Sequence, residues 1–472
     1  MKCTSMWSYR PYRPMDWPHQ TVEVARMAPG PDNLELDYWP ETTVEVRWRG
    51  PQEGRARLVG GHGRLEGLEP GGEYALSLAL PGGVFGPWIP FRTGFVPGQV
   101  VNYLHPQDER HSFSGRYLCS PSLAMLPSGA LVASMDVYYT AAGGSNEWSK
   151  QAGNLHTQRL MISRDGGISW RPQCQLFPCF WGKLFVHGGT LYMLGVSTEY
   201  GDLLIARSDD EGASFGAPTR LLPGSGRSAR GGVHRAPVPV IEAGGRLYTA
   251  VEWGGWEMGG HASAMLSAPS GADLLRAESW SVTPLTAQDT AWPGAAAGPA
   301  MGMLEGNAVE GPDGRVYNLL RYAIGGCRPD HDRAVMLAYQ GPDEPQQFVK
   351  IVDFPGGITK FCIRRDLESD RYVALINRIT RQDAPAARNV LSLSTSEDLV
   401  HWQVHADLID YRDSDPGLIG FQYPDFQMVG DDLLALSRTA FNGAHSFHDS
   451  NFITFHRISN FRALYQRRVE QA

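Results

Sequence analysis

Two oppositely charged side chains, Glu305 and Arg321, stand at the two ends of a hairpin pattern. Residues 304–322 read LEGNAVEGPDGRVYNLLRY, in which PDG supplies turn residues between two runs of mostly apolar positions. In an antiparallel pair, the beginning of the first strand and the end of the second lie at the same end of the sheet. We therefore expect the carboxylate and the guanidinium to emerge together, and two opposite charges at one edge indicate a site.

The same hairpin recurs along the chain and repeats this strand end. Turn residues precede the runs ALVASMD, TLYMLGV, RLYTAVE, RVYNLLR, RYVALIN and DLLALSR, at spacings of about sixty residues. Counting equally from each turn defines one rung of equivalent positions: Asp136, Val196, Glu252, Arg321, Asn377 and Arg438. Most members are polar or charged, so we expect the six strand ends to converge on one pocket.

Several cations near this rung could bind an anionic substrate. Arg321 and Arg438 end two of the strands, Arg378 adjoins the fifth strand end, and Lys360 begins the fifth hairpin. A guanidinium can bind a carboxylate through two parallel hydrogen bonds, which makes arginine the stronger candidate for planar recognition.

Candidate acids lie on the same rung and in the loop that follows it. Asp136 and Glu252 end strands, and burial beside an apolar group such as Trp253 would raise a carboxyl pKa toward a useful range. The loop GAHSFHDSNFITFHR brings His445 and His448 above the same face, beside an aspartate. A histidine next to a carboxylate can act as general acid or base near neutral pH. The alternative for each is a solvated strand-end group.

Aromatic residues in the loops between second and third strands could complete a sugar site. Trp148, Trp253 and Trp256 occupy such loops. Exposed rings there favour stacking on sugars, although packing within a loop is an equal alternative.

The elements that must position these residues form an all-β chain. Six hairpins, each followed by further strands, predict six four-stranded blades of a β-propeller over residues 98–472. The last blade lacks one strand, and the run 98–103 ahead of the first hairpin would supply it and close the ring. Residues 1–97 contain short strands between Gly and Pro turns, which predicts a small β-sandwich.

Composition limits the class of function. The chain has 472 residues and a net charge of −8, which argues against general binding to nucleic acid or to membrane surfaces. No apolar run approaches a membrane span and the beginning lacks the apolar core of a signal peptide, so we expect a cytoplasmic protein. The six cysteines and the histidines show no metal-ligand spacing, and we expect no cofactor or metal. Oligomeric state is open.

Two turns carry a recognisable motif, Ser-x-Asp-x-Gly-x-x-Trp/Phe. The runs SRDGGISW and SDDEGASF fit it, and LSTSEDLVHW is a degenerate third copy. Such a turn bonds its own amides, uses a glycine at positive φ and fills the sheet gap with an aromatic ring. With six hairpins, these motifs resemble the Asp-box propellers of the sialidase superfamily, which implies a six-bladed ring with the boxes opposite the active site. The run LEGLEPGGEYALSLAL resembles a fibronectin type III domain with Tyr74 as its corner tyrosine, which implies a docking or spacer role.

The sialidase resemblance assigns chemistry to three positions. Glu305 and Arg321 resemble the glutamate and arginine of one blade, and Tyr423, in Tyr-Pro-Asp-Phe, resembles the nucleophilic tyrosine of a Tyr-Ser-Asp-Leu motif. The resemblance implies that Glu305 draws on the phenol proton of Tyr423 while arginines bind the substrate carboxylate. A tyrosine suits an anionic sugar because an attacking carboxylate would be repelled.

The chain departs from the family pattern at two places. Cys119-Ser120-Pro121 stands where the family has Arg-Ile-Pro, so the first arginine of the carboxylate clamp is missing. The loop WSKQAGNLHTQRL lacks the aspartate that the family uses as its acid. Arg438 would replace the arginine, and Asp136 or the histidine loop would supply the acid.

We therefore predict an exo-acting glycoside hydrolase that releases an acidic sugar, of sialic acid or uronate type, from an oligosaccharide. The missing arginine favours a substrate other than ordinary sialic acid. One alternative is a polysaccharide lyase, in which arginines neutralise a uronate and Tyr423 or His448 removes the α-proton. Another is a propeller that binds carbohydrate without catalysis.

Overall fold

The computed structural model describes residues 8–11, 22–110, 115–138, 156–296, 300–324, 330–381 and 383–466. Trp148, a predicted stacking residue, lies outside these ranges. Strands dominate, and the helical turns are η2 (Trp256–Met258), η3 (Ala277–Ser279), η4 (Asp330–Asp332) and α2 (Ala463–Gln466). None of the helices in the described ranges has the length and apolar character needed to cross a membrane.

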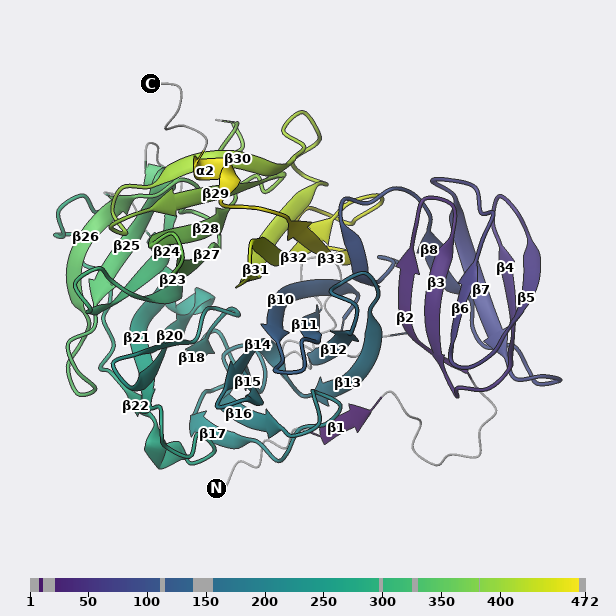
Figure 1. Cartoon of the computed structure of the whole chain (residues 1–472), viewed down its shortest axis with the longest axis horizontal. Coiled ribbons are helices and arrows are strands. Elements are labelled where there is room, and N and C mark those ends of the chain that lie inside the picture. The colour runs from purple at the N-terminus through teal and green to yellow at the C-terminus, as the bar shows by residue number, and fades with distance from the viewer. Residues whose placement is uncertain are drawn as a thin grey trace.

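Within the described ranges, six antiparallel sheets form a ring, as predicted (Figure 1). Blade one contains β10 (Tyr117–Met125), β11 (Leu131–Tyr138), β12 (Thr157–Ser163) and β13 (Arg171–Phe177), with β1 (Ser8–Pro11) added on β13. Blade two contains β14 (Phe180–His187), β15 (Thr190–Val196), β16 (Leu203–Ser208) and β17 (Thr219–Leu222). Blade three contains β18 (Gly232–His234) and β19 (Ile241–Ala243), both paired with β20 (Arg246–Gly255), then β21 (Gly260–Pro269) and β22 (Ser281–Val282).

The second half of the ring is built in the same way. Blade four contains β23 (Ala300–Glu310), β24 (Val316–Ile324), β25 (Arg333–Ala338) and β26 (Gln347–Asp353). Blade five contains β27 (Cys362–Asp366), β28 (Arg371–Ile376), β29 (Val390–Ser396) and β30 (Gln403–Asp410). Blade six contains β31 (Gly420–Val429), β32 (Asp432–Ala440), β33 (Phe452–Ile458) and β9 (Gln99–Tyr103).

Strand β9 closes the ring, which confirms the prediction for the run 98–103. It pairs antiparallel with β33, with Asn102 opposite Ile453 and Tyr103 opposite Phe452. The first strand of the ring thus completes the last blade, which ties the beginning of the ring to its end. Buried apolar residues fill the space between neighbouring blades.

The Asp-box turns have the predicted geometry. In the first, Ser163 Oγ donates to Asp165 Oδ1 at 2.8 Å and accepts from the Gly167 amide at 2.8 Å. Gly167 has a φ of 95°, a conformation that favours glycine, and Trp170 is buried. The second box repeats these bonds from Ser208. Because both turns join third to fourth strands, they lie at the end of the ring opposite the rung.

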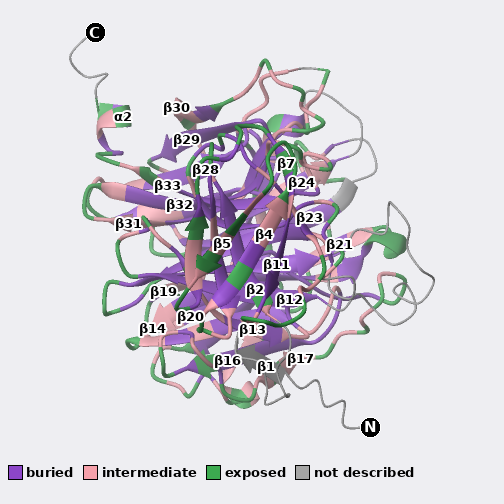
Figure 2. Cartoon of the chain, turned by 90° about the vertical axis from the view of Figure 1, so that its right-hand side faces the viewer, coloured by how far each residue is buried: buried purple, intermediate pink, exposed green. Residues whose placement is uncertain are grey.

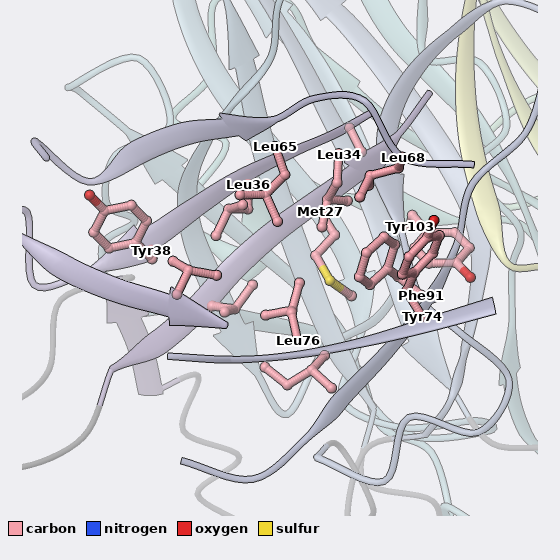
Figure 3. Packing of buried hydrophobic residues seen from close by; sticks show 14 of the residues in the cluster. Met27, Leu34, Leu36, Tyr38, Leu65, Leu68, Tyr74, Leu76, Phe91 and Tyr103 are labelled. Atoms are coloured by element: carbon pink, nitrogen blue, oxygen red, sulfur yellow. The ribbon is translucent and has the colours of Figure 1, made fainter. Parts of the chain in front are cut away.

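The N-terminal part is a β-sandwich beside the ring (Figure 1). One sheet holds β2 (Glu23–Pro29), β3 (Leu34–Trp39) and β6 (His62–Leu65); the other holds β5 (Gly54–Leu58), β4 (Val44–Arg49), β7 (Glu73–Ala79) and β8 (Ile89–Arg92). Apolar side chains fill the space between the sheets (Figure 3), and β4 and β5 present exposed positions outward (Figure 2).

The sandwich is joined to the ring by buried contacts. Tyr103 of β9 belongs to the sandwich core, and Arg26 Nε donates to the Val101 carbonyl at 2.7 Å. Asp37 accepts from Arg26 at 3.1 Å and from Arg171 of blade one at 2.7 Å. The two parts therefore pack through β9 and blade one.

Candidate active site

The six equivalent strand ends of the rung lie at one level of the ring. Most of their polar side chains bind the neighbouring blade and do not line the central cavity. Asp136 Oδ1 accepts from the Trp181 amide of blade two at 2.8 Å, and Glu252 Oε1 accepts from the Gly306 amide of blade four at 3.1 Å. Asn377 Nδ2 donates to the Phe421 carbonyl of blade six at 2.7 Å. Each of these polar side chains therefore reaches the innermost strand of the next blade.

The two rung arginines make the same kind of contact and also face a central cavity. Arg321 Nε donates to the Ile358 carbonyl, just before blade five, at 2.7 Å. Arg438 Nη1 lies 2.7 Å from Cys119 Sγ of blade one. We expected all six strand ends to converge on one pocket, but of the rung residues Arg321 and Arg438 line the cavity. The shorter polar side chains of the rung bind the backbone of the next blade instead.

Four innermost strands carry a β-bulge at this level. The register shifts between Cys119 and Ser122 in β10, and equivalent shifts occur in β14, β23 and β31. Four residues inside these bulges have positive φ: Ser120 (38°), Trp181 (51°), Glu305 (56°) and Tyr423 (53°). Bulges re-aim side chains, and non-glycine residues at positive φ concentrate at functional sites. The backbone therefore turns Glu305 and Tyr423 toward the ring axis.

The cavity at this level has a volume of about 320 Å³, and all six blades contribute to it. Its lining consists of Cys119, Ser120, Tyr138, His156, Phe180, Trp181, Glu199, His234, Trp256, Leu304, Glu305, Arg321, Arg388, Tyr423, Arg438 and His448.

Tyr423 and Glu305 meet in this cavity. The Tyr423 hydroxyl donates to Glu305 Oε1 at 2.8 Å, and Arg321 Nη1 donates to Glu305 Oε2 at 2.8 Å. Burial alone would raise the pKa of Glu305, but Arg321 and His234 outweigh it and the pKa is lowered. Burial and the Glu305 charge raise the pKa of Tyr423 to about 12. Glu305 is thus an ionised acceptor for a phenol that still carries its proton.

Three guanidinium groups surround this pair: those of Arg388 and Arg438 are buried, and that of Arg321 is partly buried. Arg388 and Arg438 lie over the Tyr423 ring, with guanidinium carbons 5.4 and 5.2 Å from its centroid. Arg438 Nη2 also donates to the Tyr138 hydroxyl at 2.5 Å, and Arg388 donates to the Gln422 side chain. Burial, with the neighbouring arginines, lowers the pKa of Arg388 to about 10. A negative charge entering the cavity would compensate this crowding of cations.

A second charged cluster surrounds Asp425, two residues after Tyr423 on β31. Asp425 is buried; it accepts from Lys183 Nζ at 2.5 Å, from the Leu123 amide at 2.8 Å and from Arg364 at 3.3 Å. Lys360 Nζ donates to the carbonyl of Pro424 at 2.5 Å. Lys360, which we expected to bind substrate, therefore fixes the backbone between Tyr423 and Asp425.

Four other predicted residues lie outside the cavity lining. Asp136 is covered by the Trp181 amide, and burial raises its pKa well above the ordinary value. Glu252 lies behind His234, with Oε2 3.3 Å from His234 Nδ1. Arg378 pairs with Asp407 at 2.5 Å. Trp253 borders a separate apolar pocket, whereas Trp256 lines the cavity.

The histidine loop reaches the cavity through one of its two histidines. His448 lines the cavity, and its Nδ1 lies 3.0 Å from Asp449 Oδ1. Burial and Arg438 lower the pKa of His448 to about 4. His445 is about half exposed, lies 3.1 Å from Asp449 Oδ2 and stacks on Tyr117. His448 is therefore a neutral imidazole near neutral pH and lacks the imidazolium form that could serve as a general acid.

Aromatic rings form a continuous wall across blades one to three. Phe180 stacks on His156 and on Trp181, with centroids 3.9 and 4.4 Å apart. Trp181 packs edge-on to His234 at 4.5 Å, and Trp256 lies 6.0 Å from the same histidine. Such a wall suits the apolar face of a sugar ring.

Sequence reasoning missed several lining residues. Arg388 precedes the third strand of blade five, and Glu199 follows the second strand of blade two by three positions. Extending the rung count a few residues beyond each second strand, and to the beginning of each third strand, would have included both. His234 and Trp181 lie on the innermost strands of their blades. Counting from the hairpin turns aligns the second strands of the blades, so it does not identify residues on the innermost strands.

Among the residues that the structure describes, no group of three or more His, Cys, Asp or Glu is arranged to hold a metal ion.

Comparison with known proteins shows the fold. No protein-family model and no curated protein sequence matches this chain. The structure is similar to an α-L-arabinanase from Penicillium chrysogenum complexed with arabinobiose, with a TM-score of 0.51, 13% identity, and coverage of 79% of this chain and 99% of that one. The structure is also similar to a Hadza microbial sialidase, with a TM-score of 0.50, 12% identity, and coverage of 96% of this chain and 99% of that one. A leech intramolecular trans-sialidase matches with a TM-score of 0.52 and 11% identity, over 97% of this chain and 94% of that one. The chain therefore shares the propeller fold of glycoside hydrolases.

Proposed function

We propose that this protein is an exo-acting glycoside hydrolase that releases a terminal acidic sugar, of sialic acid or uronate type, from an oligosaccharide. The observation that carries the proposal is the hydrogen-bonded pair of Tyr423 and Glu305 in a cavity that is also lined by three arginines. The relatives in fold act on sialic acid or on arabinose-containing compounds, as their names state.

The site suits a retaining mechanism. The Tyr423 oxygen attacks the anomeric carbon while its proton passes to Glu305 Oε1, and the bond to the leaving oxygen breaks as an acid in the cavity protonates that oxygen. Water then attacks the same carbon and gives a proton back to the conjugate base of that acid, while Tyr423 leaves with the proton returned by Glu305. Arg321 keeps Glu305 ionised in the resting state, which makes it a ready proton acceptor.

The charge of the cavity favours an anionic sugar over arabinose. Arg321, Arg388 and Arg438 face it from blades four, five and six, and Glu305 is the ionised carboxylate that pairs with Arg321. A neutral sugar would leave the excess positive charge uncompensated, whereas a substrate carboxylate can form charge-assisted hydrogen bonds with it. Arg438 stands against Cys119, where the sequence lacks the expected arginine. This supports its role as the replacement.

The cavity also favours cleavage at a chain end. Its volume of about 320 Å³ lies at the lower end of the range for ligand pockets and suits a single sugar. The aromatic wall of Phe180 and Trp181 would contact the apolar face of that sugar, opposite the arginines.

Hydrolysis of two aryl glycosides tests the proposal. We expect release of methylumbelliferone from an α-sialoside or a β-glucuronide, but none from an α-L-arabinofuranoside. Tyr423→Phe should lower kcat on the order of 10³-fold or more, because the nucleophile is lost. No turnover of either acidic glycoside would refute the proposal. An unsaturated product absorbing in the near ultraviolet from a uronate oligosaccharide would identify a lyase instead.

We further propose that the N-terminal sandwich is a fibronectin type III-like spacer. The Tyr74 hydroxyl accepts from the Glu69 amide at 2.8 Å, as a corner tyrosine bonds the backbone a few residues upstream. Removal of the Tyr74 hydroxyl should destabilise the sandwich with little effect on kcat, which urea unfolding followed by tryptophan fluorescence and steady-state kinetics would check.

A further inference from the structure

Glu199 brings a second carboxyl group into the cavity, and the mechanism described above gives it no role. It follows β15 in blade two, and it lines the same cavity as Tyr423 and Glu305. In ring order one blade separates blade two from blade four on one side and from blade six on the other. Glu199 therefore lines the cavity from a side of the ring different from those of Glu305 and Tyr423.

The turn that carries Glu199 is firmly anchored. The Gly201 amide donates to the Thr198 carbonyl at 2.8 Å, and Tyr200 between them has a φ of 59°. The Tyr200 carbonyl accepts from the Gly226 amide at 2.8 Å, and its buried ring lies parallel to His261. A non-glycine residue at positive φ is kept only where its surroundings enforce it. The turn therefore presents Glu199 in a defined position.

The two cavity carboxyl groups have opposite environments. Burial raises the pKa of Glu199, and His234 only partly counters this. Arg321 and His234 hold the pKa of Glu305 below its ordinary value. Two carboxyl groups with divergent pKa values in one site are typical of an acid and a base with separate roles.

We propose that Glu199 is the general acid and base of the hydrolysis. As Tyr423 bonds to the anomeric carbon, the Glu199 carboxyl donates its proton to the glycosidic oxygen, which leaves as an alcohol. In the second step the Glu199 carboxylate takes a proton from water, whose oxygen bonds to the anomeric carbon as Tyr423 departs. This assignment rests on the proposed function.

The structure leaves the other candidates less suited to this role. Asp136 is sealed behind the Trp181 amide and does not line the cavity. His448 is neutral near neutral pH, so it is too weak an acid to protonate the leaving oxygen. His234 has its Nδ1 bound to Glu252 and influences both Glu199 and Glu305. It acts in this scheme as a positioning residue.

The test compares two leaving groups in Glu199→Gln. A sugar alcohol such as the lactose of sialyllactose needs protonation, whereas methylumbelliferone does not. We expect kcat/KM to fall on the order of 10²- to 10⁴-fold for the disaccharide-linked substrate and less than about tenfold for the aryl glycoside. Sodium azide should restore aryl turnover and give the glycosyl azide. The alkaline limb of the wild-type pH profile should also disappear.

Glu257→Gln is the matched control. Glu257 is an exposed residue on the neighbouring η2 turn, bonded to Ser228 Oγ at 2.6 Å, and it does not line the cavity. We expect wild-type kinetics on both substrates. Thermal unfolding and Glu199→Asp guard against misfolding, since the shorter acid should keep a reduced activity together with its alkaline limb.

The outcomes separate the two proposals. Equal losses on both leaving groups without azide rescue, or wild-type kinetics in Glu199→Gln, would overturn the role of Glu199 while leaving the hydrolase intact. A wild-type protein inactive on sialosides and uronides alike would refute the hydrolase, and the Glu199 assignment would fall with it. Where the wild type cleaves only uronides, the aldobiouronic disaccharide takes the place of sialyllactose.

Discussion

Replacement of Asp425 by asparagine should destabilise the ring more than any single change at the cavity surface. Asp425 is fully buried and is the carboxylate that Lys183 and Arg364 share, at 2.5 and 3.3 Å. Asparagine keeps the shape of the side chain but leaves these cations without a counter-charge. Removing one partner from a buried ion pair costs about 3–5 kcal/mol.

Urea unfolding measures this loss. With a denaturant dependence of about 3 kcal/mol per molar, a loss of about 3–5 kcal/mol lowers the midpoint by about 1–1.7 M. Lys183→Met, in which Asp425 keeps Arg364, should lose less than Asp425→Asn. The double variant should recover part of the loss, because one of the orphaned cations is also gone.

The pH dependence follows from the direction of the pKa shift. Lys183 and Arg364 outweigh burial and hold the pKa of Asp425 below its ordinary value, so its contribution is present above the unfolded carboxyl pKa of about 3.9. It is lost as the pH falls toward the folded pKa. The gap between wild type and Asp425→Asn should therefore shrink as the pH falls below about 5 toward the folded pKa. A loss under about 1 kcal/mol at neutral pH would refute the buried, ionised carboxylate.

Three further predictions concern the clamp, the Asp box and ring closure. Arg438→Lys should lower kcat/KM for an acidic glycoside about 10- to 100-fold, because about 1.5–3 kcal/mol of charged hydrogen bonding is lost; unchanged kinetics would exclude Arg438 from the clamp. Trp170→Ala should cost about 3–5 kcal/mol in urea unfolding yet leave the KM of the folded enzyme unchanged, since it lies opposite the cavity. A chain beginning at residue 98 should give a soluble ring by gel filtration, whereas one beginning at residue 104 should aggregate because β33 loses β9; equal behaviour would contradict closure by β9.

Much of the architecture follows from local sequence patterns. The turn residues and alternating strands predicted six hairpins, and the missing strand of the last blade predicted closure by β9. Glu305, Arg321 and Tyr423 were named from one hairpin and one resemblance, and Glu305 accepts a hydrogen bond both from Arg321 of its own blade and from Tyr423 of blade six. Equivalent strand ends of a closed ring lie at the same end of its axis. The position of a residue along its strand is therefore enough to predict that these side chains come close together.

The direction of individual side chains could not be predicted in the same way. Asp136 and Glu252 share the rung with Arg321 and Arg438, yet they bind amides of the next blade. The difference depends on side-chain length and on bulges in a neighbouring blade, neither of which the hairpin pattern contains. The position of Glu199 depends on a turn that the Gly226 amide holds, and Gly226 follows two strands later in the chain, after β16 and β17.

The blade-to-blade contacts of the rung have a consequence for how activity arises during folding. Glu252 of blade three supports the backbone amide beside Glu305 in blade four, and Arg438 of blade six reaches back to Cys119 of blade one. A ring that lacks one blade would leave at least one side of the cavity without the contacts that the neighbouring blade supplies. Catalytic competence should therefore appear in a single late event, when the final blade docks, with no weakly active precursor before it.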